Sequence, residues 1–285
     1  MYAVKRIIAG DYVFTKQYTG NPEKAMKSHQ QTRAKKKNPT RDEVKRYNRR
    51  MRVERLQTLI ILNFKGGFVL TLEYGEDSQP QDYKSADNTM MQFLRGIKRE
   101  LRNKSKDFKY ISVTERGHER EHLHHHVLVD SQETADLLRR KWNHGNVHVK
   151  KTHGEDNAYL ALAEYLLKDD TKEEKPKGSS YHASRNLKQP TIERELHAGA
   201  WREEPAPEQG FEILTESVRN GFYEPLGIRY RSYTQKRKID PSERQKEGIK
   251  IRRGVALFKN TLKHDYKKKL ERAANGIKSL FNAVI

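Results

Sequence analysis

The chain has 285 residues, with 58 Lys and Arg against 38 Asp and Glu, a formal net charge of +20 and no cysteine. This length suits one sizeable domain with extensions, or two domains, and the lack of cysteine excludes disulfides and Cys-based zinc sites. So large a positive charge favours a polyanionic partner, nucleic acid first and an anionic membrane surface second. The N-terminus lacks the apolar run of a signal peptide, and no segment resembles a membrane span, so we expect a soluble, cytoplasmic protein.

The first 55 residues are basic and poor in apolar side chains, which predicts an arm followed by an exposed helix. Arg49, Arg50 and Arg52 give that helix a cationic face suited to a phosphate backbone. A solvated helix without a ligand is the alternative. The apolar runs Leu59–Phe64 and Phe68–Tyr74, joined by Lys65-Gly66-Gly67, then predict a β-hairpin.

The central part of the chain alternates helical and strand patterns. Apolar residues three and four apart predict helices that begin near Ser85 and Ser131, and a third at Asn157–Lys168. Strands are predicted at Phe108–Thr114, His124–Val129 and Asn146–Lys150.

The resulting order, β-β-α-β-β-α-β-α, predicts an α+β fold with a mainly antiparallel central sheet and helices packed on it. We expect basic helical extensions at both ends. The predicted division is a basic arm and helix at 1–55, a globular domain at 56–200, and a mostly helical accessory region at 201–285.

The strand that contains consecutive histidines is the sharpest local signal. In an extended strand His122, His124 and His126 share one face, so two imidazoles can aim at one point. Glu115 ends the preceding strand and falls beside them if the two strands pair. Two histidines and a carboxylate suit Mg²⁺ or Mn²⁺ bound together with a substrate phosphate. A solvated histidine face, or an adventitious metal site, is the alternative.

These residues also carry a resemblance. Glu115-Arg-Gly, a polar loop, and then His124-x-His126 before Val-Leu-Val resemble the second motif of the HUH superfamily, in its rolling-circle replication initiators. The match to His124 and His126 is better than to His122 and His124. Phe68–Tyr74 is similar to the first motif of that family. The resemblance implies the HUH endonuclease fold for residues 56–200, with Mg²⁺ or Mn²⁺ held by Glu115, His124 and His126.

The third helix contains a candidate nucleophile. Tyr165 and Lys168 lie three residues apart and share a helix face. A tyrosine oxygen can attack phosphorus and leave a covalent intermediate, although tyrosines on amphipathic helices are usually packing residues. Tyr165-x-x-Lys168 resembles the third motif of the same family, in which the tyrosine attacks DNA. Ala161 and Glu164 depart from the two-tyrosine form, so we predict a single-tyrosine enzyme in which Tyr159 is structural.

The segment 180–190 resembles the one that follows the tyrosine helix in these initiators. It offers Arg185 and Lys188 for phosphate contacts near the active site, and an ordinary surface loop is the alternative.

The resemblance implies site-specific nicking and rejoining of single-stranded or hairpin origin DNA through a 5′-phosphotyrosine. Such a reaction would initiate rolling-circle replication of a bacterial plasmid, phage or integrated element. The chain has no P-loop motif, so a host helicase and DNA polymerase are the expected partners. A relaxase or a single-tyrosine transposase of the same superfamily is the nearest alternative. A non-catalytic nucleic-acid-binding protein and a zinc-dependent hydrolase are alternatives from other classes.

Overall fold

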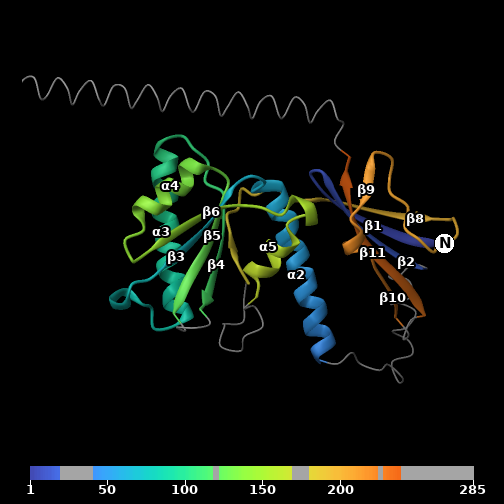
Figure 1. The fold of residues 1–285 in the computed structure, drawn as a ribbon, viewed down its shortest axis with the longest axis horizontal. Coiled ribbons are helices and arrows are strands. Elements are labelled where there is room, and N and C mark those ends of the chain that lie inside the picture. The colour runs from blue at the N-terminus through green and yellow to red at the C-terminus, as the bar shows by residue number, and fades with distance from the viewer. Residues whose placement is uncertain (20–40, 118–121, 169–179, 224–226, 239–285) are drawn as a thin grey trace, which may run out of the picture. The chain divides into compact units, whose positions relative to one another are not determined.

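The computed structural model describes residues 1–19, 41–117, 122–168, 180–223 and 227–238. Residues Met1–Lys236 form one compact unit. Its layers alternate: Figure 1 shows helices α3 and α4, a first sheet, helices α2 and α5, and a second sheet. The predicted lysines at 33–40 and the predicted tail helices at 254–285 lie outside the described residues.

The first sheet has five antiparallel strands in the order β6-β3-β5-β4-β7. The strands are β3 (Phe68–Glu73), β4 (Tyr110–Arg116), β5 (Leu123–Val129), β6 (Val147–Lys151) and β7 (His182–Ala183). One face packs on helices α3 (Tyr83–Asn103) and α4 (Gln132–Lys141) through a buried cluster that includes Leu70, Val127, Leu94 and Leu138.

The other face of this sheet packs on helices α2 (Arg41–Asn63) and α5 (Leu160–Leu166). Ile111 and Leu128 of the sheet share a buried cluster with Ile60 of α2 and Leu166 of α5. The α+β class and the mainly antiparallel sheet are therefore confirmed, and the arrangement is consistent with the HUH endonuclease fold. Strands β3 to β6 and helices α3 to α5 follow the predicted order, with η2 (Glu76–Ser78) and η3 (Glu155–Asn157) as short 3-10 turns.

The predicted hairpin at Leu59–Tyr74 is wrong, because its first half continues helix α2 to Asn63. The apolar run belongs to a longer pattern in which Val53, Leu56, Ile60 and Phe64 recur at intervals of three or four residues and are all buried. A helix buries this stripe against both sheets, whereas a strand would direct half of it into solvent.

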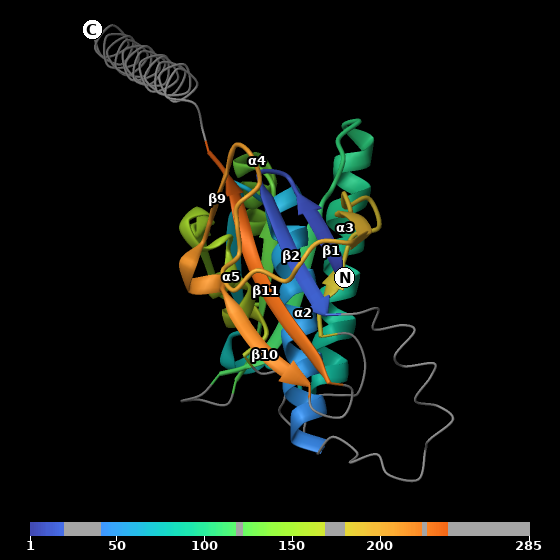
Figure 2. The same ribbon diagram turned by 90° about the vertical axis from the view of Figure 1, so that its right-hand side faces the viewer.

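The second sheet has six strands and combines both ends of the described chain. Its path is β10-β11-β2-β1-β8, and β9 pairs with β11. The strands are β1 (Tyr2–Ala9), β2 (Tyr12–Thr19), β8 (Thr191–His197), β9 (Phe211–Ile213), β10 (Arg219–Tyr223) and β11 (Ile228–Arg237), with a 3-10 turn η4 (Thr215–Ser217). Figure 2 shows this sheet lying over α2.

Secondary structure at both ends therefore differs from the expected arm and mostly helical region. Gly10, with a φ of 58°, and Asp11 form a two-residue turn between β1 and β2, and a Gly-Asp pair between β-rich runs is a hairpin signal. The strands persist because Ile7, Tyr12 and Phe14 bury their side chains against α2. In the part of the chain that the structure describes, no helix is both long and apolar enough to cross a membrane.

Candidate active site

Three predicted metal ligands meet where β4 and β5 pair. Glu115 lies directly opposite His124 in the antiparallel register, and His126 follows on the same face. His126 Nε2 lies 3.3 Å and His124 Nε2 3.6 Å from Glu115 Oε2. The ligand atoms of the three residues all lie within 4.8 Å of one another, so one ion can contact all of them. His122 lies before the strand and outside this group.

The neighbouring strand β3 orients one of the two rings. Thr71 lies opposite His126, and its hydroxyl oxygen is 3.1 Å from His126 Nδ1. That contact leaves Nε2 directed at Glu115. A second partner that fixes ring orientation is the usual arrangement around metal-binding histidines.

Glu115 is fully buried, and its charge is held by cationic neighbours. Burial alone would raise the pKa of its carboxyl, but His124 and His126, together with the Lys168 ammonium, outweigh burial and hold the pKa well below its usual range. Lys168 Nζ lies 2.9 Å from Glu115 Oε2. Neither carboxylate oxygen has a hydrogen bond of regular geometry within the described residues, so these contacts are ion pairs by distance. A buried carboxylate without regular hydrogen bonds, beside two imidazoles, fits a divalent cation.

Helix α5 places Tyr165 at this cluster. Its side chain is 46% exposed, so a substrate can reach the hydroxyl. That hydroxyl lies 3.3 Å from His126 Nε2, and Lys168 Nζ lies 4.4 Å from the centre of the tyrosine ring. Tyr159 is fully buried, and its hydroxyl donates to Glu155 Oε1 at 2.9 Å. It therefore has the surroundings of a packing residue.

Behind the cluster, the intervening histidine is anchored on the opposite sheet face. His125 is fully buried, with Tyr74 Oη 2.7 Å from its Nε2 and Thr114 Oγ1 3.0 Å from its Nδ1. Thr114 also donates to Asp87. Burial lowers the pKa of His125 to about 3, which keeps the ring neutral at physiological pH.

Sequence reasoning missed Thr71 and Glu73, which β3 places on the face that carries His126 and His124. Glu73 lies directly opposite His124, and its carboxylate is 3.6 Å from His148 Nε2. The alternation of Phe68–Glu73 identifies these side chains once β3 is known to pair with β5.

The predicted DNA-contacting residues fall into two groups. Arg50 is exposed on α2, and Arg49 and Arg52 beside it are partly exposed. Gln57 Nε2 donates to Ala158 O at 2.8 Å just before α5 begins. The basic N-terminal half of α2 therefore extends toward the end of the molecule where β4 and β5 connect, as Figure 1 shows.

Arg185 and Lys188 are exposed but are not brought to the cluster. Strand β7 pairs with Ile111 and Ser112 and runs antiparallel to β4, so the chain after Ala183 moves away from Glu115. The Lys188 backbone N–H donates to Asn63 Oδ1 at the C-terminal end of α2. The expected position of these two residues near the active site is thus not seen.

Comparison with known proteins adds one finding. Residues 67–170 match a family of replication-associated proteins, the ORF2 family. The match supports a replication initiator. The matched segment contains all five residues of the cluster, namely Glu115, His124, His126, Tyr165 and Lys168. Comparison with curated proteins and with solved structures gave no significant match.

Proposed function

We propose that this protein nicks and rejoins single-stranded origin DNA through a 5′-phosphotyrosine on Tyr165, and thereby initiates rolling-circle replication. One observation carries the proposal: the accessible Tyr165 hydroxyl lies 3.3 Å from His126 Nε2, at a buried cluster of two histidines and a glutamate. A tyrosine beside a candidate metal site suits attack on a phosphodiester better than binding alone.

The reaction is a transesterification at phosphorus. The Tyr165 oxygen loses its proton and forms a bond to the phosphorus atom, and the bond to the DNA 3′-oxygen breaks. That oxygen takes a proton and becomes a 3′-hydroxyl that a host DNA polymerase can extend. The reverse reaction rejoins the strand without ATP, because the phosphotyrosine conserves the bond energy.

Glu115, His124 and His126 would hold Mg²⁺ or Mn²⁺. When bound, such an ion supplies Lewis-acid polarisation of the scissile phosphate. The Lys168 ammonium, 4.4 Å from the centre of the Tyr165 ring, stabilises negative charge on the tyrosine oxygen or on the phosphate. Because Lys168 also contacts Glu115, it can leave that carboxylate for the phosphate when a cation takes its place.

The basic half of α2 would hold DNA through its phosphates. Arg49, Arg50 and Arg52 lie on the helix that extends past α5, and the net charge of +20 favours salt-sensitive binding of DNA. A host helicase would separate the strands, in the cytoplasm of a bacterium that carries the replicating element.

Covalent adducts test the proposal directly. The purified protein is incubated with Mn²⁺ and a single-stranded library from candidate origins, and adducts are resolved on a denaturing gel. We expect adducts with the unmodified protein and with Tyr159→Phe, because Tyr159 is buried away from the cluster. Tyr165→Phe should form none, and EDTA should prevent adducts in every sample.

Equal adduct formation by Tyr165→Phe would show that another residue is the nucleophile. No adduct with any library member, despite tight salt-dependent binding, would favour the non-catalytic nucleic-acid-binding protein.

A further inference from the structure

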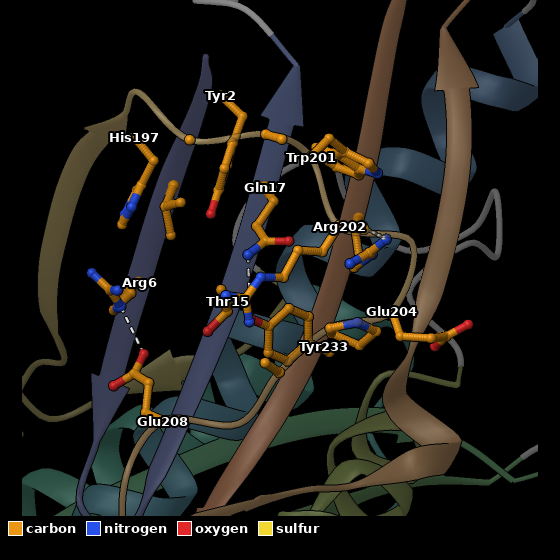
Figure 3. Close-up of a pocket in the computed structure, with 16 residues that line it drawn as sticks. Tyr2, Arg6, Thr15, Gln17, His197, Trp201, Arg202, Glu204, Glu208 and Tyr233 are labelled. Carbon is orange, nitrogen blue, oxygen red and sulfur yellow. Dashed lines mark hydrogen bonds and ion pairs between the residues drawn. The ribbon is translucent and has the colours of Figure 1, made fainter.

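A pocket of about 460 Å³ lies on the six-stranded sheet and shares no residue with the candidate active site. This volume is within the range of roughly 300–1,000 Å³ that is usual for small-ligand sites. Figure 3 shows side chains from β1, β2 and β11 lining the pocket, with Trp201 and Arg202 contributed by the segment that follows β8.

The register explains why these side chains gather on one face. Arg6 of β1 lies opposite Thr15 of β2, which lies opposite Tyr233 of β11, so all three share a face. The alternate residues, such as Ile7 and Phe14, pack against α2 on the other face. The pocket face is therefore the one that α2 does not cover.

Aromatic rings line the pocket at its β1 end. The rings of Tyr2 and His197 stack with centroids 5.1 Å apart and an interplanar angle of 11°. The Trp201 ring meets Tyr2 edge-on at 5.9 Å, and Tyr233 lines the pocket further along the sheet. Such rings present flat apolar surfaces to a planar ligand.

The arginines in the pocket are already engaged. Arg6 makes ion pairs of 2.8 Å with both Glu195 and Glu208. Arg231 is 3% exposed, donates to Asn220 Oδ1 at 2.9 Å, and lies 4.9 Å from the centre of the Trp201 ring. Because carboxylates or polar oxygens already hold these cations, the pocket is poorly suited to a phosphate. A neutral planar group with polar edges fits it better.

We infer that this pocket binds an unpaired nucleobase of single-stranded DNA, stacked on its aromatic side chains. Stacking of bases on aromatic side chains is a common way to hold a single strand without reading its sequence. Hydrogen-bonding groups at the base edge would meet Thr15, Gln17 and Glu208. The inference rests on the proposed function only in assuming that the chain binds single-stranded DNA.

Binding to two oligonucleotides of equal length tests the inference. One is unmodified, and the other carries abasic sites throughout, so that both offer the same phosphates. Affinities are measured in EDTA on a Tyr165→Phe background, which keeps nicking out of the result. Trp201→Ala should weaken binding of the unmodified strand by roughly 5- to 100-fold, with little effect on the abasic strand.

Leu196→Ala is the matched control. Leu196 is 56% exposed and adjoins His197 on β8, but it lies opposite Ala3 rather than Tyr2 and so faces away from the pocket. It should leave both affinities unchanged. Trp201→Phe should retain most of the binding, because a flat ring remains. Since Trp142 is buried, quenching of tryptophan fluorescence by the unmodified strand should report on Trp201 without any substitution in the pocket.

Three outcomes would overturn the inference. They are equal weakening of both strands by Trp201→Ala, no weakening of either strand, and tighter binding of free deoxynucleotides than of the strand. A failure to form covalent adducts would not affect this experiment, so the two proposals fail independently.

Discussion

Lys168 and a metal ion compete for the same carboxylate oxygen. The ammonium lies 2.9 Å from Glu115 Oε2, where a bound cation would also find its ligand. Lys168→Met removes the charge while keeping most of the side-chain volume. Because the lysine is 43% exposed and partly screened, we expect only about three- to tenfold tighter Mn²⁺ binding by calorimetry. Adduct formation should fall nonetheless, because the charge near Tyr165 is lost.

Tyr165→Phe is the control for that measurement, since it alters a neighbouring ring without changing charge. Its affinity for Mn²⁺ should stay within about twofold of the unmodified protein, a difference of about 0.4 kcal/mol in binding free energy. Weaker Mn²⁺ binding in Lys168→Met would contradict the competition.

His125 makes stability depend on pH. Burial lowers the pKa of this ring to about 3, whereas the unfolded chain titrates near 6.5. The unfolded state therefore binds the extra proton first as pH falls, so stabilisation is complete above pH 6.5 and is lost between pH 6.5 and 3. The slope is about 1.4 kcal/mol per pH unit. Urea unfolding should show a steeper decline from pH 6.5 to 5 in the unmodified protein than in His125→Gln.

The control for this experiment is His148→Gln, an exposed histidine on β6. It should reproduce the pH dependence of the unmodified protein. Parallel curves for His125→Gln and the unmodified protein would mean that His125 is not the group responsible.

At this scale the sequence supports a good part of the candidate site. Alternation along the histidine strand predicts that His124 and His126 share a face, and the register with Glu115 confirms that they meet. The support from Thr71 depends on which strand lies beside β5, and that pairing is a tertiary property. The 2.9 Å contact between Lys168 and Glu115 likewise requires the packing of α5 against the sheet.

Helix α2 has two faces with separate roles. Leu56 is fully buried between the sheets, and Arg50 is exposed on the same helix. Leu56→Ala should reduce the free energy of unfolding by about 2–5 kcal/mol, because it leaves a cavity. Arg50→Ala should leave stability unchanged and lower the slope of log affinity against log salt for single-stranded DNA by about 0.7. Urea unfolding and salt-dependent binding measure the two effects.

Each variant is the control for the other. A loss of DNA affinity in Leu56→Ala while it remains folded, or a loss of stability in Arg50→Ala, would show that the two faces are not separate.

The same helix shows why prediction by elements was incomplete. Leu59–Phe64 is short and apolar, and periodicity alone cannot assign such a run to a helix or a strand. Only the preceding Val53 and Leu56 reveal the helical spacing, and they lie within a stretch dominated by arginine. The ion pair of 2.8 Å between Lys16 of β2 and Glu54 of α2 then fixes the helix to a sheet that local patterns did not predict.

For the whole molecule, bound metal should raise the melting temperature. An ion that binds only the folded state at about 100 times its Kd stabilises by about 2.7 kcal/mol. For a unit of this size that corresponds to a shift of roughly 5–10 °C. We expect this shift with Mn²⁺, reversed by EDTA, in scanning calorimetry.

Glu115→Gln should abolish the shift, because it removes the charged ligand of the cluster. Asp11→Asn, which changes an exposed carboxylate in the β1–β2 turn, should keep it. A full shift in Glu115→Gln would place the stabilising ion elsewhere.

The second sheet joins the two ends of the described chain, with Ile7 beside Ile192 and Phe14 beside Thr234. During synthesis, β1 and β2 leave the ribosome long before the strands that border them. The inner edge strands must therefore wait, unpaired on both outer sides, until β8 and β11 are made. Contacts between such distant positions also make folding slow. An initiator assembled in this way completes its second sheet only near the end of translation, so a delay separates the start of its synthesis from the first active copy.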